Sequence, residues 1–228
     1  MSKYTFVLFD ADATLFDFKK SEHSAVIDCL RFAGLPVTDE VIAKYSEIND
    51  GYWKKLERSE VTRGQLFVAR WRDLMKFYGF DFDAQIIANL YPQKLAEKGF
   101  LIEGAEEICQ ALYGKVKLYI VTNGFARVQH GRFDKSPLRK YFDEMFISEE
   151  VGAEKPSVAY FEAVFSKIPD FDKEKALIIG DSLTSDIKGG IAAGIDTCWY
   201  NPKDLPAPEK LPITYVINKL SEIESIVL

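Results

Sequence analysis

The chain has 228 residues, 47% of them hydrophobic, and a formal net charge of −6. This length and composition are typical of one α/β domain with an insertion or of two modest domains, and they allow a substantial buried core. Without a block of Lys or Arg, a long apolar run or a signal peptide, the chain is expected to bind no nucleic-acid polymer and no membrane, and to be cytoplasmic.

The first predicted element is a strand over residues 4–9, an apolar run that leads into Asp10-Ala11-Asp12-Ala13-Thr14. Because side chains alternate along a strand, Asp10 and Asp12 are expected to leave its end on the same side. Two carboxylates about 4 Å apart repel each other by about 4 kcal/mol at an effective dielectric near 20. Such a pair is tolerated where a cation or a substrate needs both groups, and the alternative is a solvated pair of turn aspartates.

Residues 17–96 contain few strand-like runs and four amphipathic helical patterns, at residues 25–33, 41–48, 66–78 and 84–95. We therefore predict an all-helical cap domain over 17–96, inserted into a core domain formed by 1–16 and 97–228. Its aromatic residues are expected mostly in the core of the cap: Tyr52, Trp53, Phe67, Trp71, Phe77, Tyr78 and Phe80. Its basic residues are expected on solvated helix faces: Lys54, Lys55, Arg63 and Arg70.

From residue 97 onward, apolar runs alternate with helical patterns. The strand-like runs cover residues 116–121, 145–147, 176–179, 197–200 and 214–217, and they are continuously apolar. Strands buried on both faces have this pattern, and regular alternation with helices is typical of parallel sheets. The predicted fold class is therefore α/β, a doubly wound parallel sheet with the inserted helical cap.

Four polar loops follow predicted strands. Besides the loop at Asp10, these are Thr122-Asn123-Gly124, the loop that reaches Lys155, and the loop that carries Asp181 and Asp186. In an open α/β sheet, ligands bind outside the carboxyl ends of the strands. We therefore expect the four loops to meet at one site.

The residue types at this site indicate its chemistry. Four carboxylates are expected to form an oxygen-rich metal site: Asp10, Asp12, Asp181 and Asp186. Such ligands suit Mg²⁺, whereas the two histidines are far from these loops in sequence and zinc is not favoured. Lys155 is a point charge for a carboxylate or a phosphate oxygen, and Thr122 with the amides near Asn123 and Gly124 provides donors to an anion. A metal, a lysine and donors around a carboxylate are an arrangement for phosphoryl transfer.

In their order, these motifs resemble those of the haloacid dehalogenase superfamily of aspartate-nucleophile phosphatases, over about residues 4–200. The first motif is Asp10-x-Asp12-x-Thr14, the second Thr122, the third Lys155, and the fourth Gly180-Asp181-x4-Asp186. The helical insertion resembles the small cap domain of that family. Asp-Ala-Asp-Ala-Thr, Thr-Asn-Gly and residues 148–156 also resemble a bacterial branch of pyrimidine 5′-nucleotidases.

The resemblance implies a role for each motif. Asp10 would attack phosphorus and form an aspartyl-phosphate, and Asp12 would protonate the leaving oxygen and then activate water. The Asp10 carboxylate, the Asp12 backbone carbonyl and Asp181 would hold Mg²⁺. Asp186 would be a further ligand or would fix Lys155. Thr122 and Lys155 would be catalytic, and Asn123 and Gly124 would bind substrate.

The predicted function is Mg²⁺-dependent hydrolysis of small phosphate monoesters, with pyrimidine nucleoside 5′-monophosphates as the first candidates. Asp12 favours a phosphatase or a phosphomutase, because members that cleave carbon–halogen bonds lack this second aspartate. The alternatives are a phosphatase for phosphoglycolate or a sugar phosphate, a phosphomutase, or a non-catalytic anion-binding protein. A monomer and a homodimer are both open.

Two further expectations concern residues beside these motifs. The family usually has Gly where this chain has Ala13, and because a Cβ disfavours positive φ, we predict ordinary backbone angles there. Arg127, Gln129 and Arg132 follow Thr-Asn-Gly on a predicted helix, and we expect them to stabilise that helix or a surface.

Overall fold

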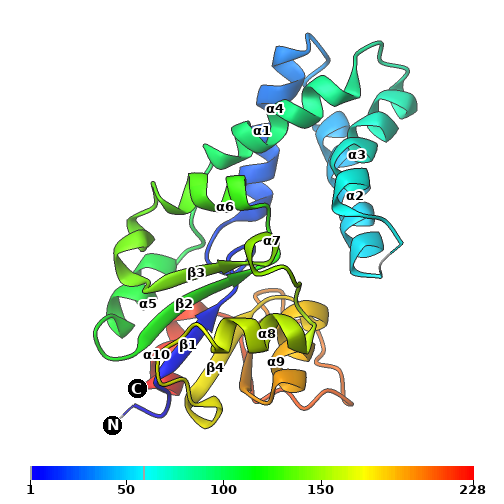
Figure 1. Ribbon diagram of the computed structural model, residues 1–228. Coiled ribbons are helices and arrows are strands. Elements are labelled where there is room, and N and C mark those ends of the chain that lie inside the picture. The colour runs from blue at the N-terminus through cyan, green and yellow to red at the C-terminus, as the bar shows by residue number, and fades with distance from the viewer. Residues whose placement is uncertain (1, 59) are drawn as a thin grey trace. The chain divides into compact units, whose positions relative to one another are not determined.

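The computed structural model in Figure 1 describes residues 2–58 and 60–228. The chain divides into two compact units, one formed by Met1–Phe18 and Gly99–Leu228 and the other by Lys19–Lys98. We call them the sheet unit and the helical unit. Both junctions lie two residues further along the chain than the boundaries expected from sequence.

The sheet unit is built on six parallel strands in the order β3-β2-β1-β4-β5-β6. The strands are β1 (Phe6–Phe9), β2 (Lys117–Thr122), β3 (Glu144–Ile147), β4 (Ala176–Gly180), β5 (Asp196–Tyr200) and β6 (Tyr215–Ile217). In register, β1 pairs with Lys117 to Ile120 on one side and with Ala176 to Ile179 on the other. The predicted doubly wound parallel sheet is confirmed.

Apolar clusters cover both faces of this sheet. Val7 and Phe9 of β1 belong to one cluster, together with residues of α5, η1 and α10. Phe6 and Leu8 belong to the other, together with residues of α8 and α9. The helices of the sheet unit are α5 (Ala105–Leu112), α6 (Ala126–Phe133), η1 (Pro137–Tyr141), α7 (Ser148–Val151), α8 (Val158–Phe165), η2 (Lys173–Lys175), η3 (Leu183–Ile187), α9 (Lys188–Ala193), η4 (Leu220–Glu222) and α10 (Ile223–Val227). Burial on both sides explains why the strands are continuously apolar.

The described residues of the helical unit form four helices, and local sequence sets the starts of three of them. The four helices are α1 (Phe18–Phe32, which begins at the junction), α2 (Asp39–Glu57), α3 (Arg63–Tyr78) and α4 (Ala84–Ala96). Thr38, Thr62 and Asp83 cap α2, α3 and α4 by accepting hydrogen bonds from backbone N–H groups of the first turn. Gly79 ends α3 in the left-handed conformation, with φ 67°.

An aromatic cluster fills the interior of the helical unit. The ring centroids of Tyr45 and Trp71 are 4.2 Å apart, and that of Tyr91 lies 5.5 Å from Trp71. Of the seven aromatic residues expected in this core, Trp71 is buried, five are half-buried and Phe77 is exposed. The prediction was therefore wrong for Phe77, since its helical spacing did not reveal which face of α3 is covered.

A buried polar network links three helices of this unit. Glu22 of α1 accepts hydrogen bonds from Ser46 Oγ and Asn49 Nδ2, each at 2.7 Å. Arg70 Nη1 of α3 donates to Asn49 Oδ1 at 2.8 Å, and its guanidinium lies 4.7 Å from the Tyr91 ring centroid. Arg70 is 2% exposed, so the expectation of a solvated position was wrong. A guanidinium is tolerated inside the unit because the network and the ring provide polar partners.

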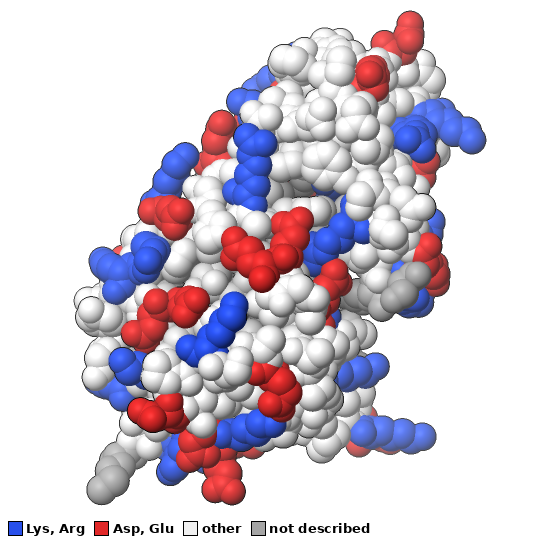
Figure 2. Space-filling view, in the orientation of Figure 1, with Lys and Arg blue, Asp and Glu red and all other residues white. Residues whose placement is uncertain are grey.

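Three further findings concern the cysteines, membrane-spanning helices and surface charge. Cys29, Cys109 and Cys198 are free and buried. In the part of the chain that the structure describes, no helix has the length and apolar character needed to cross a bilayer. Figure 2 shows Lys and Arg interspersed with Asp and Glu on its visible face, without a continuous basic patch there.

Candidate active site

The site lies where the strand order reverses. β1 and β4 are neighbours in the sheet, and the strands after β1 are added on one side while those after β4 are added on the other. Asp10 follows β1 directly and Asp181 follows β4 directly. Ligands of open α/β sheets bind at this switch point, outside the carboxyl ends of the strands.

The turn after β1 contradicts one expectation. Ala13 has φ 63°, in the left-handed region, where ordinary angles were predicted. Three backbone hydrogen bonds of 2.8–3.0 Å connect Ala11 with Leu15 and Phe16, and Ala13 with Phe16. Leu15 and Phe16 are fully buried. The hydrogen bonds and the buried side chains fix this turn, and they outweigh a conformational cost of about 1 kcal/mol for alanine.

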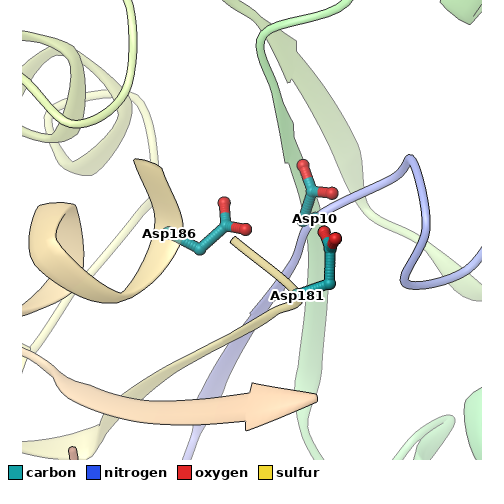
Figure 3. A group of neighbouring side chains, drawn as sticks. All are labelled: Asp10, Asp181 and Asp186. Atoms are coloured by element: carbon teal, nitrogen blue, oxygen red, sulfur yellow. The ribbon is translucent and has the colours of Figure 1, made fainter. Parts of the chain in front are cut away.

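Three carboxylates converge at the switch point. Asp10, Asp181 and Asp186 each offer one oxygen within 4.8 Å of the others. Figure 3 shows their carboxylate groups turned toward one another. Burial raises the pKa of Asp10 well above its ordinary value, against the opposing charge of Lys155. Burial and the charge of Asp186 raise the pKa of Asp181 to about 7. This grouping of anions favours a bound cation.

Lys155 is the buried cation of this cluster. Its Nζ donates hydrogen bonds to Asp10 Oδ1 at 2.6 Å, to Asp186 Oδ1 at 2.7 Å and to the carbonyl of Val121 at 2.7 Å. Burial lowers the pKa of Lys155, but the charges of Asp10 and Asp186 raise it more, so the ammonium form is favoured. Three carboxylates and one ammonium leave two negative charges uncompensated. Oxygen ligands with this charge fit a divalent cation such as Mg²⁺.

A glycine makes room for Asp186. A Cβ at Gly180 would lie 2.3 Å from Asp186 Oδ2, closer than any contact between such atoms. The backbone N–H of Ser182 donates to the same oxygen at 3.1 Å, and Trp199 Nε1 donates to the Asp181 carbonyl at 2.9 Å. Asp181 therefore places its carboxylate at the end of β4, and Gly180 leaves room beside it for the side chain of Asp186.

The loop after β2 holds the loop that carries Lys155. Asn123 Nδ2 donates to the Lys155 carbonyl at 2.8 Å, and the Lys155 N–H donates to Asn123 Oδ1 at 2.9 Å. The Gly124 N–H donates to Thr122 Oγ1 at 3.1 Å. The side chain of Asn123 and the N–H of Gly124 are thus engaged within the protein, and their contacts with a substrate stay a prediction.

Asp12 lies apart from the three carboxylates and is held by α6. Gln129 Nε2 donates to Asp12 Oδ2 at 2.8 Å and to Thr122 Oγ1 at 3.1 Å. Arg132 forms an ion pair with the other Asp12 oxygen, Oδ1. Gln129 and Arg132 are both 1% exposed, so they do not lie at a surface, the second of the two expected positions, although the bonds from Arg132 to Gln129 do link residues of the helix. Their spacing of three residues, which places both on one helix face, was the available signal.

The structure thus brings Asp10, Lys155, Asp181 and Asp186 together directly, and Gln129 connects Asp12 with Thr122. A family model for haloacid dehalogenase-like hydrolases matches residues 4–194. The chain belongs to the haloacid dehalogenase-like hydrolases. The matched residues include the four loops at the switch point.

Several proteins resemble the chain over nearly its full length. HAD-hydrolase YfnB of Bacillus subtilis is 42% identical, covering 98% of this chain and 95% of that protein. Pyrimidine 5′-nucleotidase PynA of Streptococcus pneumoniae is 36% identical, covering 96% and 93%. Pyrimidine 5′-nucleotidase YjjG of Escherichia coli is 30% identical, covering 98% of each. A crystal structure of YfnB bound to magnesium superimposes with a TM-score of 0.94 at 40% identity, over 98% of each chain.

Proposed function

We propose that this hydrolase is a Mg²⁺-dependent phosphatase for small phosphate monoesters, with pyrimidine nucleoside 5′-monophosphates as its preferred substrates. The observation that carries the proposal is the cluster of three carboxylates at the switch point, in which the buried Asp10 and Asp186 share Lys155. Asp10, Asp181 and the Asp12 carbonyl would hold the ion, with Asp186 as a further ligand. When bound, Mg²⁺ would neutralise negative charge on the phosphoryl group.

Asp10 is the proposed nucleophile. Lys155 binds its Oδ1, and no described residue donates a hydrogen bond to its Oδ2 that would compete with attack. In the first step, an Asp10 oxygen bonds to phosphorus and the bond from phosphorus to the ester oxygen breaks. Lys155 holds the carboxylate in place and offsets its charge, while Asp186 orients Lys155.

Asp12 is the proposed general acid and base. In its acid form it gives a proton to the leaving ester oxygen, which departs as an alcohol. As a carboxylate it then takes a proton from the water that attacks the phosphorus of the aspartyl-phosphate. That attack breaks the bond between phosphorus and Asp10, releases phosphate and restores both carboxyl groups. The water's second hydrogen stays on the phosphate.

The choice of substrate is supported by the relatives. Two proteins named pyrimidine 5′-nucleotidases, PynA and YjjG, resemble the chain from end to end.

The test is phosphate release from pyrimidine and purine monophosphates, phosphoglycolate and sugar phosphates, with Mg²⁺ and with EDTA. We expect the highest kcat/KM for pyrimidine monophosphates and no turnover in EDTA. Asp10→Asn should lower turnover by at least about 10⁴-fold, because it removes the nucleophile. Asp134→Asn, at an exposed position after α6, is the matched control and should behave as the parent protein.

Three results would contradict the proposal. Full activity of Asp10→Asn would exclude the aspartyl-phosphate. Equal turnover of all esters would keep the phosphatase and remove the preference for pyrimidines. Isomerisation of a phosphorylated metabolite that requires a bisphosphate activator, without phosphate release, would make the protein a phosphomutase.

A further inference from the structure

Asp12, the proposed acid and base, is held by side chains of α6. Lys155 contacts Asp10 and Asp186 but makes no hydrogen bond to Asp12, whose carboxylate is instead bound on both oxygens by α6. We propose that Gln129 and Arg132 are positioning residues that hold the Asp12 carboxyl group at the leaving oxygen and the attacking water. This inference rests on the proposed phosphatase activity and adds two residues to it.

Arg132 is a buried charge that Asp12 compensates. Its side chain is 0% exposed. Its Nη2 donates to Asp12 Oδ1 and, at 2.9 Å, to Gln129 Oε1, and its Nε donates to the same Gln129 oxygen at 3.3 Å. Nη1 has no hydrogen-bond partner among the described residues. All directed bonds of the guanidinium therefore serve Asp12 and Gln129. A well-packed apolar side chain would support the fold as well at lower desolvation cost.

The neighbours of Gln129 fix the orientation of its amide. Its Oε1 faces the guanidinium of Arg132, which only donates hydrogen bonds, so its Nε2 must face Asp12 and Thr122. The two hydrogens of Nε2 thus connect the proposed acid and base with the hydroxyl of the second motif. The position of the Thr-Asn-Gly loop and that of Asp12 are coupled through this one amide.

A glycine is required for this connection. A Cβ at Gly124 would lie 1.9 Å from Gln129 Nε2 and 2.7 Å from its Cδ. The Thr-Asn-Gly loop therefore leaves space that the amide of Gln129 occupies. A helix that was only packed against the surface would not need its side chain inserted under the loop.

Positioning matters because Asp12 follows a strand end and its side chain is 28% exposed, so it is only partly confined by packing. Proton transfer by a positioned side chain contributes about 10²–10⁴-fold to a rate. A misplacement of about 1 Å costs about 10²-fold. Two donors on one carboxylate restrict both its place and its rotation.

The test compares phenyl phosphate with 2,4-dinitrophenyl phosphate, two esters of similar shape. Phenolate is a poor leaving group that needs a proton, whereas dinitrophenolate leaves without one. The kcat/KM value covers the steps up to formation of the aspartyl-phosphate, so it reports the acid step. For Arg132→Met and Gln129→Met we expect a fall of about 100-fold with phenyl phosphate and of less than about 5-fold with the dinitrophenyl ester.

Three controls make this comparison decisive. Asp12→Asn should show the same selective loss, and Arg132→Lys, which keeps the charge but not the fork of donors, should lie between Arg132→Met and the parent. Arg127→Met, at an exposed position of the same helix, should leave the ratio of the two esters unchanged. A reduced folded fraction lowers both values equally, so the ratio is unaffected by poor folding.

An equal loss with both esters in Arg132→Met and Gln129→Met would overturn the inference and leave these residues a structural role. A selective loss that is absent from Asp12→Asn would overturn it as well. Failure of the phosphatase proposal is recognised separately, because the parent protein would then release no phosphate from either ester, or Asp10→Asn would retain that release.

Discussion

The two units bury charge in different ways. In the helical unit, Glu22 and Arg70 are joined through Asn49, so one carboxylate and one guanidinium balance each other. In the sheet unit, Lys155 lies against two carboxylates with Asp181 nearby, and negative charge is in excess. The buried charges of the helical unit compensate one another, whereas the excess negative charge of the sheet unit requires a bound cation. The difference indicates which buried cluster supports the fold and which one serves chemistry.

The location of the charges agrees with this distinction. Glu22, Asn49 and Arg70 lie within α1, α2 and α3, whose regular backbone holds the side chains in place. Asp10 and Asp181 lie just beyond strand ends, where loops open toward a ligand. Four predictions test whether the two buried clusters differ in this way.

The largest effect is expected for Lys155→Met. It leaves Asp10 and Asp186 buried without their cation, so the free energy of unfolding without metal should fall by about 3–5 kcal/mol. Urea unfolding measures this, and Mg²⁺ should restore part of the loss. Lys117→Met, which removes an exposed lysine 3.7 Å from Asp143, should change stability little. Equal stabilities of the two variants would contradict a surplus of buried charge.

Arg70→Met should have a smaller effect. It removes a donor from Asn49 and the counter-charge of Glu22, at a cost of about 2 kcal/mol. Because this network is balanced without a ligand, Mg²⁺ should not recover the loss. Glu22→Gln leaves the buried guanidinium of Arg70 without its counter-charge, so it should also lower stability in a way that Mg²⁺ does not restore. Recovery by Mg²⁺ would show that the helical unit also holds a cation.

The third prediction is a pH-dependent response to Mg²⁺. The pKa of Asp181 is raised from 3.8 to about 7 in the metal-free protein, so its stabilising contribution is present at low pH and lost as pH rises through 7. Mg²⁺ binds the ionised carboxylate. The rise in Tm that Mg²⁺ causes should therefore be larger at pH 8 than at pH 5.5, by about 2–4 °C for about 1 kcal/mol. Thermal unfolding at both pH values measures it, and Asp181→Asn should reduce the difference.

The smallest effect is expected for Ala13→Gly. Glycine adopts φ 63° without a Cβ penalty, although it gains entropy in the unfolded chain, so the net gain in stability should be about 0.5 kcal/mol. Ala11→Gly, where φ is not positive, should destabilise the protein instead. A loss of stability in both variants would mean that the turn is not strained.

The sheet was predictable because its strands are buried on both faces. Each of the six apolar runs contains most of an observed strand, and the polar loops at their ends fall at one edge. Two of the site carboxylates were visible for the same reason: Asp10 and Asp181 each stand directly after an apolar strand. Local sequence determined these features, so they could be identified without knowledge of tertiary contacts.

The polar residues of helices were not predictable in this way. Gln129, Arg132 and Arg70 were assigned to surfaces because a polar residue on a helix is usually solvated. Only the tertiary partners, Asp12 and Asn49, show that these side chains are buried. The prediction for Ala13 failed for another reason. Alanine does disfavour a positive φ, but the hydrogen bonds of the turn override this preference.

The paired hydrogen bonds between Asn123 and Lys155 have a consequence for how such an enzyme changes over time. They tie the loop after β2 to the loop after β3, and every contact described at the site joins residues of the sheet unit. The reacting groups are therefore encoded outside residues 19–98. Whatever selection acts on residues 19–98, substitutions there can accumulate without changing the geometry of the reacting groups.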